Sequence, residues 1–320
     1  MSYQTFPELD SQIDRLLSAK KENEALALLN EALDRLPNDR GDILTNRALL
    51  YCRLDQASDA LDTIKTLIEM EVSTPLRWSF FEPIRSLPGF EDVKQANDAL
   101  IRKEQANATM QYRIFQPEDA DGSTPTPLML VLHGDGGLAN LEQFPQVWPA
   151  APVTALGITV AYIQSSQVLF TNNHGWLPDY AIAQRDITEA YAAICQEIPV
   201  DADRVILSGY SGGATTSLTL AFSEALPVCG FIALSPAPWL PQGVDEVSIR
   251  KAVERGMAGV LLEGELLVPI SSETQMLEMF ASAGMRHQFV INPGVGHEFP
   301  ADLGDRVAQA ATFILSRERA

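Results

Sequence analysis

A short apolar run that ends in a serine between glycines constrains this chain more than any other feature. The run Val205-Ile-Leu-Ser-Gly-Tyr-Ser-Gly-Gly213 passes from a predicted buried strand directly into a predicted helix. Glycine has no Cβ, so Gly209 and Gly213 allow the tight turn that such a junction needs. This is the layout of a nucleophile elbow, which would expose the Ser211 hydroxyl at the carboxyl end of a strand. A glycine-rich turn without chemistry has the same pattern, so the context must decide.

A second glycine-rich loop follows an earlier apolar run. The segment Pro127-Leu-Met-Leu-Val-Leu132 predicts a strand that is buried on both faces, and His133-Gly-Asp-Gly-Gly137 comes directly after it. We expect the backbone N–H of Asp135 or Gly136 to form an oxyanion hole together with the N–H of Gly212. His133 stands at the strand end, where hydrogen bonds that brace the loop are its expected role.

A histidine near the C-terminus is the expected general base. The apolar run 287–292 predicts the last strand, and Pro293-Gly-Val-Gly-His297 forms a glycine-rich loop after it. Neutral imidazole is the usual base for a hydroxyl nucleophile. His174 lies in a polar insertion and His287 opens a strand, so His297 is the candidate base for Ser211.

The third member of such a triad is a carboxylate that orients the histidine. The run 258–264 predicts a buried strand, and Glu263 and Glu265 stand at its end. Strand alternation turns Glu263 to the opposite strand face if the strand extends that far.

Together these segments resemble the α/β-hydrolase superfamily, in which nucleophile, acid and histidine follow in this order. In that family a loop of the type Gly-x-x-Asp-x-x-Val-Pro usually carries the acid. Alignment from Val268-Pro269 implies Glu265 as the acid, although the loop is shorter and the residue is glutamate rather than aspartate. Glu263 and Asp302 remain the alternatives.

The chain divides into two predicted domains. Strand and helix patterns alternate over residues 108–320, which predicts a mostly parallel sheet with helices on both faces, the α/β-hydrolase fold. Residues 1–107 show almost no strand pattern and predict a small all-α domain. Within it, the segment 48–61 resembles a degenerate tetratricopeptide repeat. Stable arrays need about three repeats, so we expect packing on the catalytic domain; a plain helical bundle and a surface for a protein partner or self-association are both open.

Composition excludes several kinds of function. The 320 residues carry a formal charge of −19, which disfavours nucleic acid and anionic membranes as partners. The start lacks a signal-peptide pattern, and Cys52, Cys195 and Cys229 are too scattered for a metal site, so we expect reduced thiols in the cytoplasm. No metal or nucleotide motif is present, and we expect no cofactor.

Resemblance to the carboxylesterase and dienelactone-hydrolase group implies hydrolysis of a small carboxylic ester through an acyl-enzyme. Tyr210, Trp176 and Trp239 are the candidate pocket residues. Two other functions stay open: a serine peptidase of the prolyl-oligopeptidase type, and a non-catalytic scaffold that binds partners through the helical domain.

Overall fold

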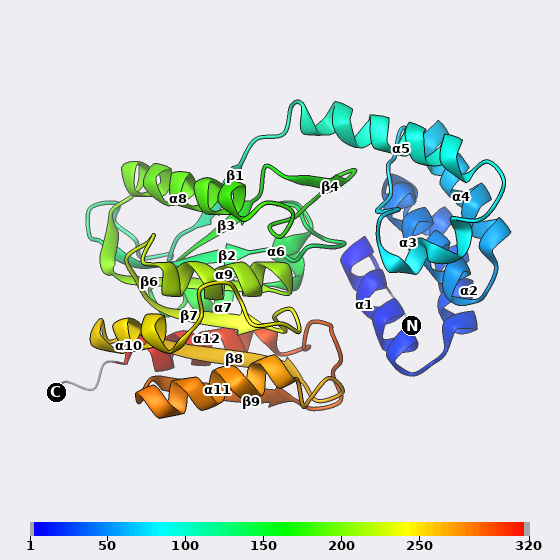
Figure 1. The fold of residues 1–320 in the computed structure, drawn as a ribbon. Coiled ribbons are helices and arrows are strands. Elements are labelled where there is room, and N and C mark those ends of the chain that lie inside the picture. Colours follow the sequence, from blue (N-terminus) through cyan, green and yellow to red (C-terminus); the bar gives the residue numbers. More distant parts are fainter. Residues whose placement is uncertain (1–2, 317–320) are drawn as a thin grey trace. The chain divides into compact units, whose positions relative to one another are not determined.

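The computed structural model describes residues 3–316, which form two compact units (Figure 1). The first, here called the helical unit, runs to Ala108 and also includes Val168–Asn173. The second, here called the sheet unit, comprises Thr109–Gln167 and the chain from His174 onward. Each unit is described by itself.

The helical unit consists of antiparallel helix pairs, as the helical pattern predicted. Ala48 and Ala60 are fully buried, and their small side chains let two neighbouring helices approach closely. Acidic residues in the first turns and basic residues in several last turns match the helix dipole. The elements are α1 (Phe6–Ser18), α2 (Glu22–Arg35), η1 (Pro37–Asp39), α3 (Arg40–Arg53), α4 (Ala57–Glu69), η2 (Ser79–Ile84) and α5 (Phe90–Gln105).

A short excursion of the later chain completes the helical unit. Strand β4 (Val168–Phe170) pairs with β5 (Asn173–His174). The backbone N–H of Thr171 donates to Ser73 Oγ at 2.8 Å, and that of Ser73 donates to Thr171 Oγ1 at 2.9 Å. The N–H of Val168 donates to Gln105 Oε1 at 2.9 Å. No pattern in the sequence indicates this excursion.

The sheet unit is a seven-stranded sheet in the order β1-β3-β2-β6-β7-β8-β9. Strand β1 is antiparallel to β3, and the other neighbours are parallel. The predicted fold class, a mostly parallel sheet with helices preceded by a helical region, is confirmed. The strands are β1 (Gln111–Phe115), β2 (Thr126–Leu132), β3 (Thr159–Gln164), β6 (Val200–Tyr210), β7 (Val228–Leu234), β8 (Ala258–Gly264) and β9 (Arg286–Asn292).

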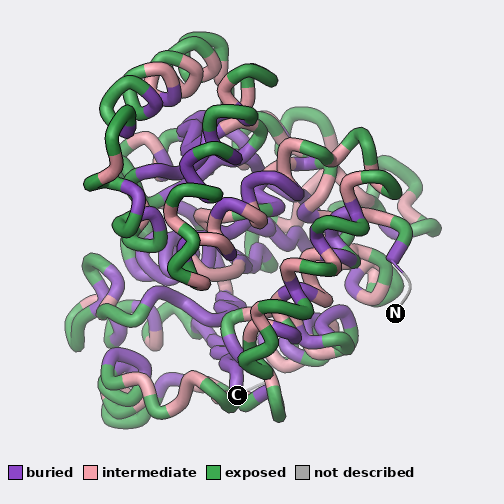
Figure 2. Tube along the Cα trace, turned by 90° about the vertical axis from the view of Figure 1, so that its right-hand side faces the viewer, coloured by how far each residue is buried: buried purple, intermediate pink, exposed green. Residues whose placement is uncertain are grey.

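Helices cover both faces of this sheet (Figure 1). Alternate residues of the buried strands point to opposite faces, so Leu130 packs toward α8–α11 and Val131 packs toward α6, α7 and α12. Figure 2 shows in purple where the buried residues lie along the chain. No helix between residues 3 and 316 combines the length and apolar character that crossing a lipid bilayer requires. The helices are α6 (Phe144–Val147), α7 (Ala151–Thr154), α8 (Tyr180–Glu197), α9 (Gly212–Ser223), α10 (Glu246–Glu254), α11 (Ser271–Ala283) and α12 (Leu303–Leu315).

Candidate active site

Ser211 stands at a strained turn between β6 and α9. Its backbone has φ 53° and ψ −117°, a region that residues with a Cβ rarely adopt. The flanking glycines leave no room for side chains: a Cβ at Gly209 would lie 2.6 Å from the carbonyl carbon of Gly213, and one at Gly213 would lie 2.2 Å from the His133 carbonyl oxygen. The close packing of this turn therefore requires glycine at both positions, and it presents the serine at the carboxyl end of β6.

His297 lies within hydrogen-bond distance of that serine, with Nε2 3.0 Å from Ser211 Oγ. Burial lowers the pKa of His297, while the charge of Glu263 acts in the opposite direction. The imidazole is therefore neutral at pH 7, as a base for a hydroxyl group must be. Tyr210 holds His297 from the elbow side, because its hydroxyl donates to the His297 carbonyl at 2.7 Å and the two rings lie 5.0 Å apart.

The loop after β2 contacts the elbow through Asp135. A Cβ at Gly212 would lie 2.2 Å from Asp135 Oδ1, so the carboxylate packs directly on the residue that follows the serine. The same carboxylate accepts the backbone N–H of Trp176 at 2.9 and 3.0 Å and that of Leu177 at 2.9 Å. These bonds fix the loop that contains Asp135 and Gly136.

His133 and Trp176 support this loop from behind. His133 Nδ1 donates to the Gly134 carbonyl at 2.7 Å, and its Nε2 accepts the N–H of Ser165 at 3.2 Å. Burial lowers the pKa of His133 to about 3, so the ring is neutral and can serve in both roles. Trp176 is fully buried and donates from Nε1 to the His133 carbonyl at 2.9 Å. Its indole thus exposes no surface to a ligand.

The three candidate carboxylates occupy different environments. Glu265 is exposed, and its Oε2 accepts the N–H of Gly294, in the loop that carries His297, at 2.8 Å. Asp302 accepts from Arg306 Nε at 2.7 Å. Glu263 is fully buried, and its Oε1 accepts from Ser235 Oγ at 2.7 Å and from the Gly264 N–H at 2.8 Å. Glu263 is also the carboxylate whose charge raises the pKa of His297.

A further buried carboxyl group, that of Glu273, lies beside Glu263. It stands in the first turn of α11 and is 1% exposed. Burial, followed by its interaction with the Glu263 carboxylate, raises the pKa of Glu273 to about 9. Glu273 is therefore protonated at pH 7. Sequence reasoning missed this residue, because a glutamate in the first turn of a helix is an ordinary helix-start signal.

Trp239 is the exposed aromatic residue among the candidate pocket residues, with 53% of its surface accessible. It follows β7 on a loop in which the Ala237 N–H donates to Thr215 Oγ1 at 2.8 Å. Thr215 lies in the first turn of α9, one helical turn after Ser211, so the loop is attached to the nucleophile helix. Of the three candidate pocket residues, Tyr210 therefore contacts His297, Trp176 supports the loop after β2, and Trp239 is exposed on the loop after β7.

The chain is similar to known proteins. The family model described as phospholipase/carboxylesterase matches residues 121–315. This range contains the elbow, the loop after β2 and the loop that carries His297. No curated protein matches the sequence at a significant level.

Solved structures resemble the chain over different lengths. The crystal structure of an uncharacterized protein from Bacillus cereus ATCC 10987 has 19% sequence identity and a TM-score of 0.52; the match covers 97% of this chain and 99% of that chain. The fluorophosphonate-binding serine hydrolase F of Staphylococcus aureus has 13% identity and a TM-score of 0.49, over 66% of this chain and 99% of that chain. An esterase from Thermogutta terrifontis has 16% identity and a TM-score of 0.46, over 69% of this chain and 94% of that chain. The first of these supports the fold over both units.

Proposed function

Because the family model spans more than half of the sequence, the chain belongs to the phospholipase/carboxylesterase family, and we propose that it hydrolyses a carboxylic ester through an acyl-enzyme on Ser211. The observation that carries this proposal is the 3.0 Å contact between Ser211 Oγ and His297 Nε2 at a strained elbow. A nucleophile within hydrogen-bond reach of a neutral base is the arrangement that acyl transfer needs.

The reaction proceeds in two halves. Ser211 Oγ attacks the ester carbonyl carbon while His297 Nε2 takes the hydroxyl proton. The N–H of Gly212 and an N–H of Asp135 or Gly136 stabilise the oxyanion. When the intermediate collapses, the ester C–O bond breaks and His297 gives its proton to the leaving alcohol. Water then attacks the acyl group with His297 again as base, and the carboxylic acid is released.

We assign the charge that stabilises protonated His297 to Glu263 rather than to Glu265. Glu263 is fully buried, where Coulomb interactions are stronger than in water, and its charge already acts on His297. Glu265, the residue implied by the sequence, instead binds the Gly294 N–H and positions the loop of the base. Glu273, whose raised pKa keeps it neutral, adds no second negative charge beside Glu263.

The exposed indole of Trp239 is the proposed wall of the substrate site. It stands on a loop attached to the first turn of α9, close in sequence to the nucleophile. Tyr210 and Trp176 support the base and the oxyanion loop rather than contact the ester. In the helical unit, the α3–α4 pair with its buried Ala48 and Ala60 is the proposed degenerate tetratricopeptide repeat.

Hydrolysis of p-nitrophenyl esters of increasing acyl length tests the proposal. Ser211→Ala and His297→Ala should each lower kcat by about 10³-fold or more. Glu263→Gln and Glu265→Gln form a matched pair, and the larger loss should follow Glu263. Wild-type protein that cleaves aminoacyl p-nitroanilides but no ester would favour a peptidase instead. Protein inert to both would contradict the assignment.

A further inference from the structure

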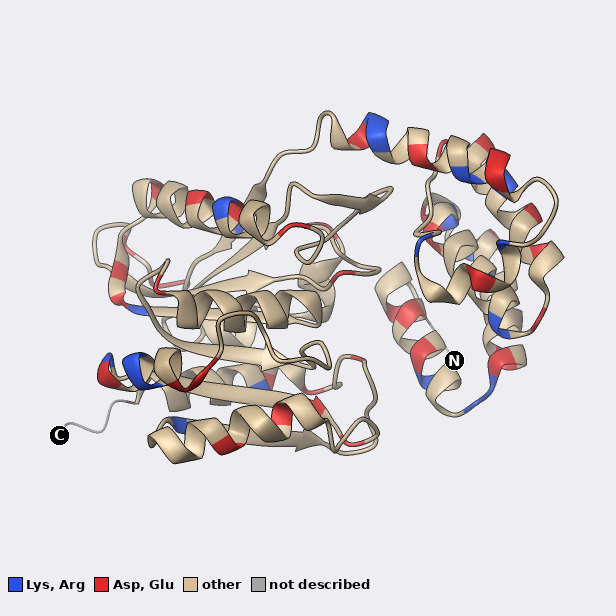
Figure 3. Ribbon diagram, viewed as in Figure 1, with Lys and Arg blue, Asp and Glu red and all other residues tan. Residues whose placement is uncertain are grey.

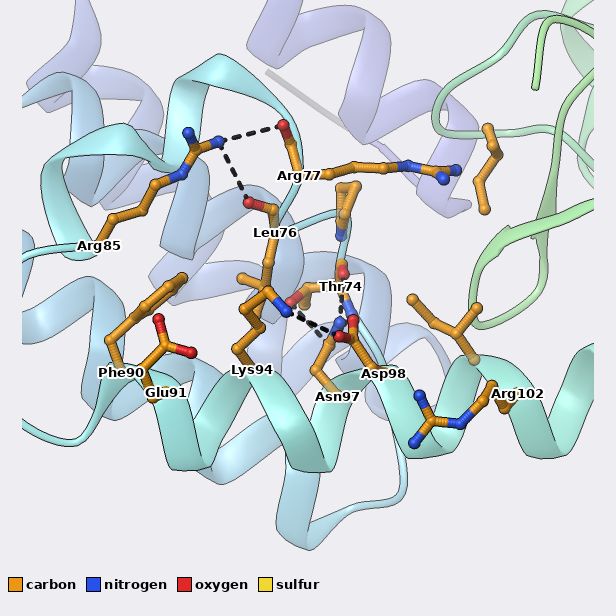
Figure 4. A pocket seen from close by; sticks show the side chains of 13 residues that line it. Thr74, Leu76, Arg77, Arg85, Phe90, Glu91, Lys94, Asn97, Asp98 and Arg102 are labelled. Carbon is orange, nitrogen blue, oxygen red and sulfur yellow. Dashed lines mark hydrogen bonds and ion pairs between the residues drawn. The ribbon is translucent and has the colours of Figure 1, made fainter.

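The helical unit contains a cavity of about 590 Å³ that the proposed reaction does not use. Its lining comes from the loop around Leu76, from α5, and from Leu169 of the excursion (Figure 4). This volume lies within the range of about 300–1,000 Å³ that is usual for small-molecule sites. The cavity is therefore large enough for a small organic ligand.

Basic side chains are concentrated in this cavity, although the chain as a whole carries a charge of −19. Its lining includes four basic and two acidic residues, namely Arg77, Arg85, Lys94, Arg102, Glu91 and Asp98. Elsewhere in both units acidic residues are spread over helices and loops (Figure 3). A local excess of positive charge in an acidic protein selects for an anionic ligand.

Two of the four basic side chains already have partners within the protein. Lys94 Nζ lies 3.1 Å from Asp98 Oδ2. Arg85 Nη2 donates to the carbonyls of Arg77 at 3.1 Å and Trp78 at 3.0 Å, which fixes the loop on one side of the cavity. Within residues 3–316, no ion pair joins Arg77 or Arg102 to a carboxylate, and both side chains are exposed. These two guanidinium groups remain available to an anion.

The cavity also has a defined apolar surface and a fixed frame. Leu76, Phe90 and Leu169 are each at most 5% exposed. Asn97 is a buried residue of the lining: its Oδ1 accepts the Thr74 N–H at 2.7 Å, and its Nδ2 donates to the Thr74 carbonyl at 2.9 Å. This reciprocal pair ties α5 to the loop, so the cavity is formed before any ligand arrives.

The arrangement of the charges indicates how a ligand would lie. In Figure 4, Arg77 lies on the loop side of the cavity and Arg102 on the α5 side, both toward the right of the view, whereas Phe90 lies toward the left and Leu76 between them. We propose that this cavity binds a monocarboxylate with a medium-length apolar chain, its carboxylate paired with one of these two guanidinium groups and its chain packed on Leu76, Phe90 and Leu169.

A single negative charge fits better than a phosphate. Guanidinium groups bind carboxylate and phosphate with equal geometric ease. However, Glu91 and Asp98 belong to the same lining and repel a doubly charged head group more strongly. The apolar walls likewise favour a ligand whose greater part is hydrocarbon.

Calorimetric titration of the full-length protein with octanoate tests this proposal, with octanamide as the uncharged isostere. The test variant is Arg77→Gln/Arg102→Gln. Its matched control is Arg15→Gln/Arg53→Gln, which removes the same charge from exposed positions of the same unit outside the cavity. We expect octanoate to bind the wild type and the control equally, and to bind the test variant at least about tenfold more weakly. Octanamide should bind all three proteins weakly, and salt should weaken octanoate binding.

Three results would overturn the proposal. One is the absence of octanoate binding to the wild type up to about 10 mM. Another is equal affinity in the wild type and in Arg77→Gln/Arg102→Gln, which would place any bound octanoate elsewhere, including at Ser211. The third is equal affinity for octanoate and octanamide. None of these readouts depends on ester hydrolysis, so the inference can fail or hold independently of the proposed function.

Discussion

At the scale of single residues, the chemistry of the site depends on what surrounds His297. Its Nε2 faces Ser211, and its backbone carbonyl is held by Tyr210. Burial lowers its pKa, and the buried charge of Glu263 partly offsets this. Glu263 in turn accepts hydrogen bonds from Ser235 Oγ and the Gly264 N–H. Its charge also raises the pKa of the neighbouring Glu273.

Replacing Glu263 tests its action on His297. In Glu263→Gln the amide oxygen can still accept from Ser235, but the charge that raises the pKa of His297 is lost. The pKa of His297 should fall, so the acidic limb of the pH dependence of kcat/KM should move to lower pH. The plateau should drop by about 100-fold or more, because protonated His297 loses its counter-charge.

Glu265→Gln is the control for this measurement, since its carboxylate binds the Gly294 N–H, which an amide oxygen can also do. We expect its pH midpoint to stay unchanged. A shift of the midpoint in Glu265→Gln with none in Glu263→Gln would reassign the acid to Glu265, as the sequence alone implies.

The raised pKa of Glu273 predicts how stability changes with pH. The group has a reference pKa of 4.5 and a folded-state pKa of about 9. Between these values the unfolded chain loses the proton and the folded chain keeps it, so rising pH destabilises the fold by up to about 1.4 kcal/mol per pH unit. Glu273→Gln removes this titration and keeps a neutral side chain of nearly the same size.

Urea denaturation at pH 5, 7 and 9 would measure the effect. The free energy of unfolding of Glu273→Gln, relative to the wild type, should increase steadily with pH. A difference that stays constant over this range would show that Glu273 ionises normally in the folded protein.

At the scale of elements, the strand–turn–helix unit of β6 and α9 determines where the nucleophile stands. Gly213 packs against the backbone of β2 and the start of the following loop. This contact holds the turn at Ser211 against the loop after β2, so the geometry of the site depends on two elements far apart in sequence.

Adding one methyl group at this contact should disrupt it. In Gly213→Ala the Cβ would lie 2.2 Å from the His133 carbonyl oxygen, and backbone atoms must move to relieve the clash. We expect a loss of stability of about 2 kcal/mol or more and near-complete loss of esterase activity. Gly137→Ala is the control, since no atom lies within 4 Å of the added Cβ. Thermal unfolding measures the difference, and Gly213→Ala should melt at a lower temperature than Gly137→Ala. Similar melting temperatures would show that the turn accommodates a Cβ at Gly213.

Sequence reasoning works best where one local segment contains the whole signal. The elbow, the loop after β2 and the loop of His297 each follow their own apolar strand, which is why the α/β-hydrolase resemblance could be stated, and the family match supports it. The choice between Glu263 and Glu265 could not be made this way. It depends on how far β8 extends and on what covers its face: the strand continues through Glu263 to Gly264 and turns Glu263 into the interior.

Other features depend on contacts that sequence spacing does not encode. Glu273 meets Glu263 only because the loop between β8 and α11 brings the helix start back to the strand end. The excursion Val168–Asn173 joins the helical unit through pairs such as Ser73 and Thr171, 98 residues apart. The resemblance of residues 48–61 to a tetratricopeptide repeat stays a prediction.

At the scale of the whole molecule, the two units share the chain in an interleaved way. The chain passes from the helical unit to the sheet unit after Ala108, returns at Val168 and leaves again after Asn173. In the returning segment, Val168, Leu169 and Phe170 are each at most 6% exposed, and the Phe170 ring lies 5.6 Å from that of Trp78. The helical unit therefore buries an apolar segment that lies within the sheet unit's part of the sequence.

Deleting residues 1–108 should expose this segment. Adjoining apolar side chains that lose their cover promote self-association, so we expect the truncated chain to form oligomers or aggregates in size-exclusion chromatography with light scattering. The same truncation with Leu169→Ser and Phe170→Ser should be largely monomeric. If the unmodified truncation is monomeric as well, the excursion does not need the helical unit to cover it.

Labelling with a fluorophosphonate, followed by peptide mass spectrometry, tests whether Ser211 is a nucleophile activated by His297. We expect one adduct per chain, on Ser211, with strongly slowed labelling in His297→Ala and none in Ser211→Ala. Labelling of a different serine, or equal labelling of wild type and Ser211→Ala, would contradict it.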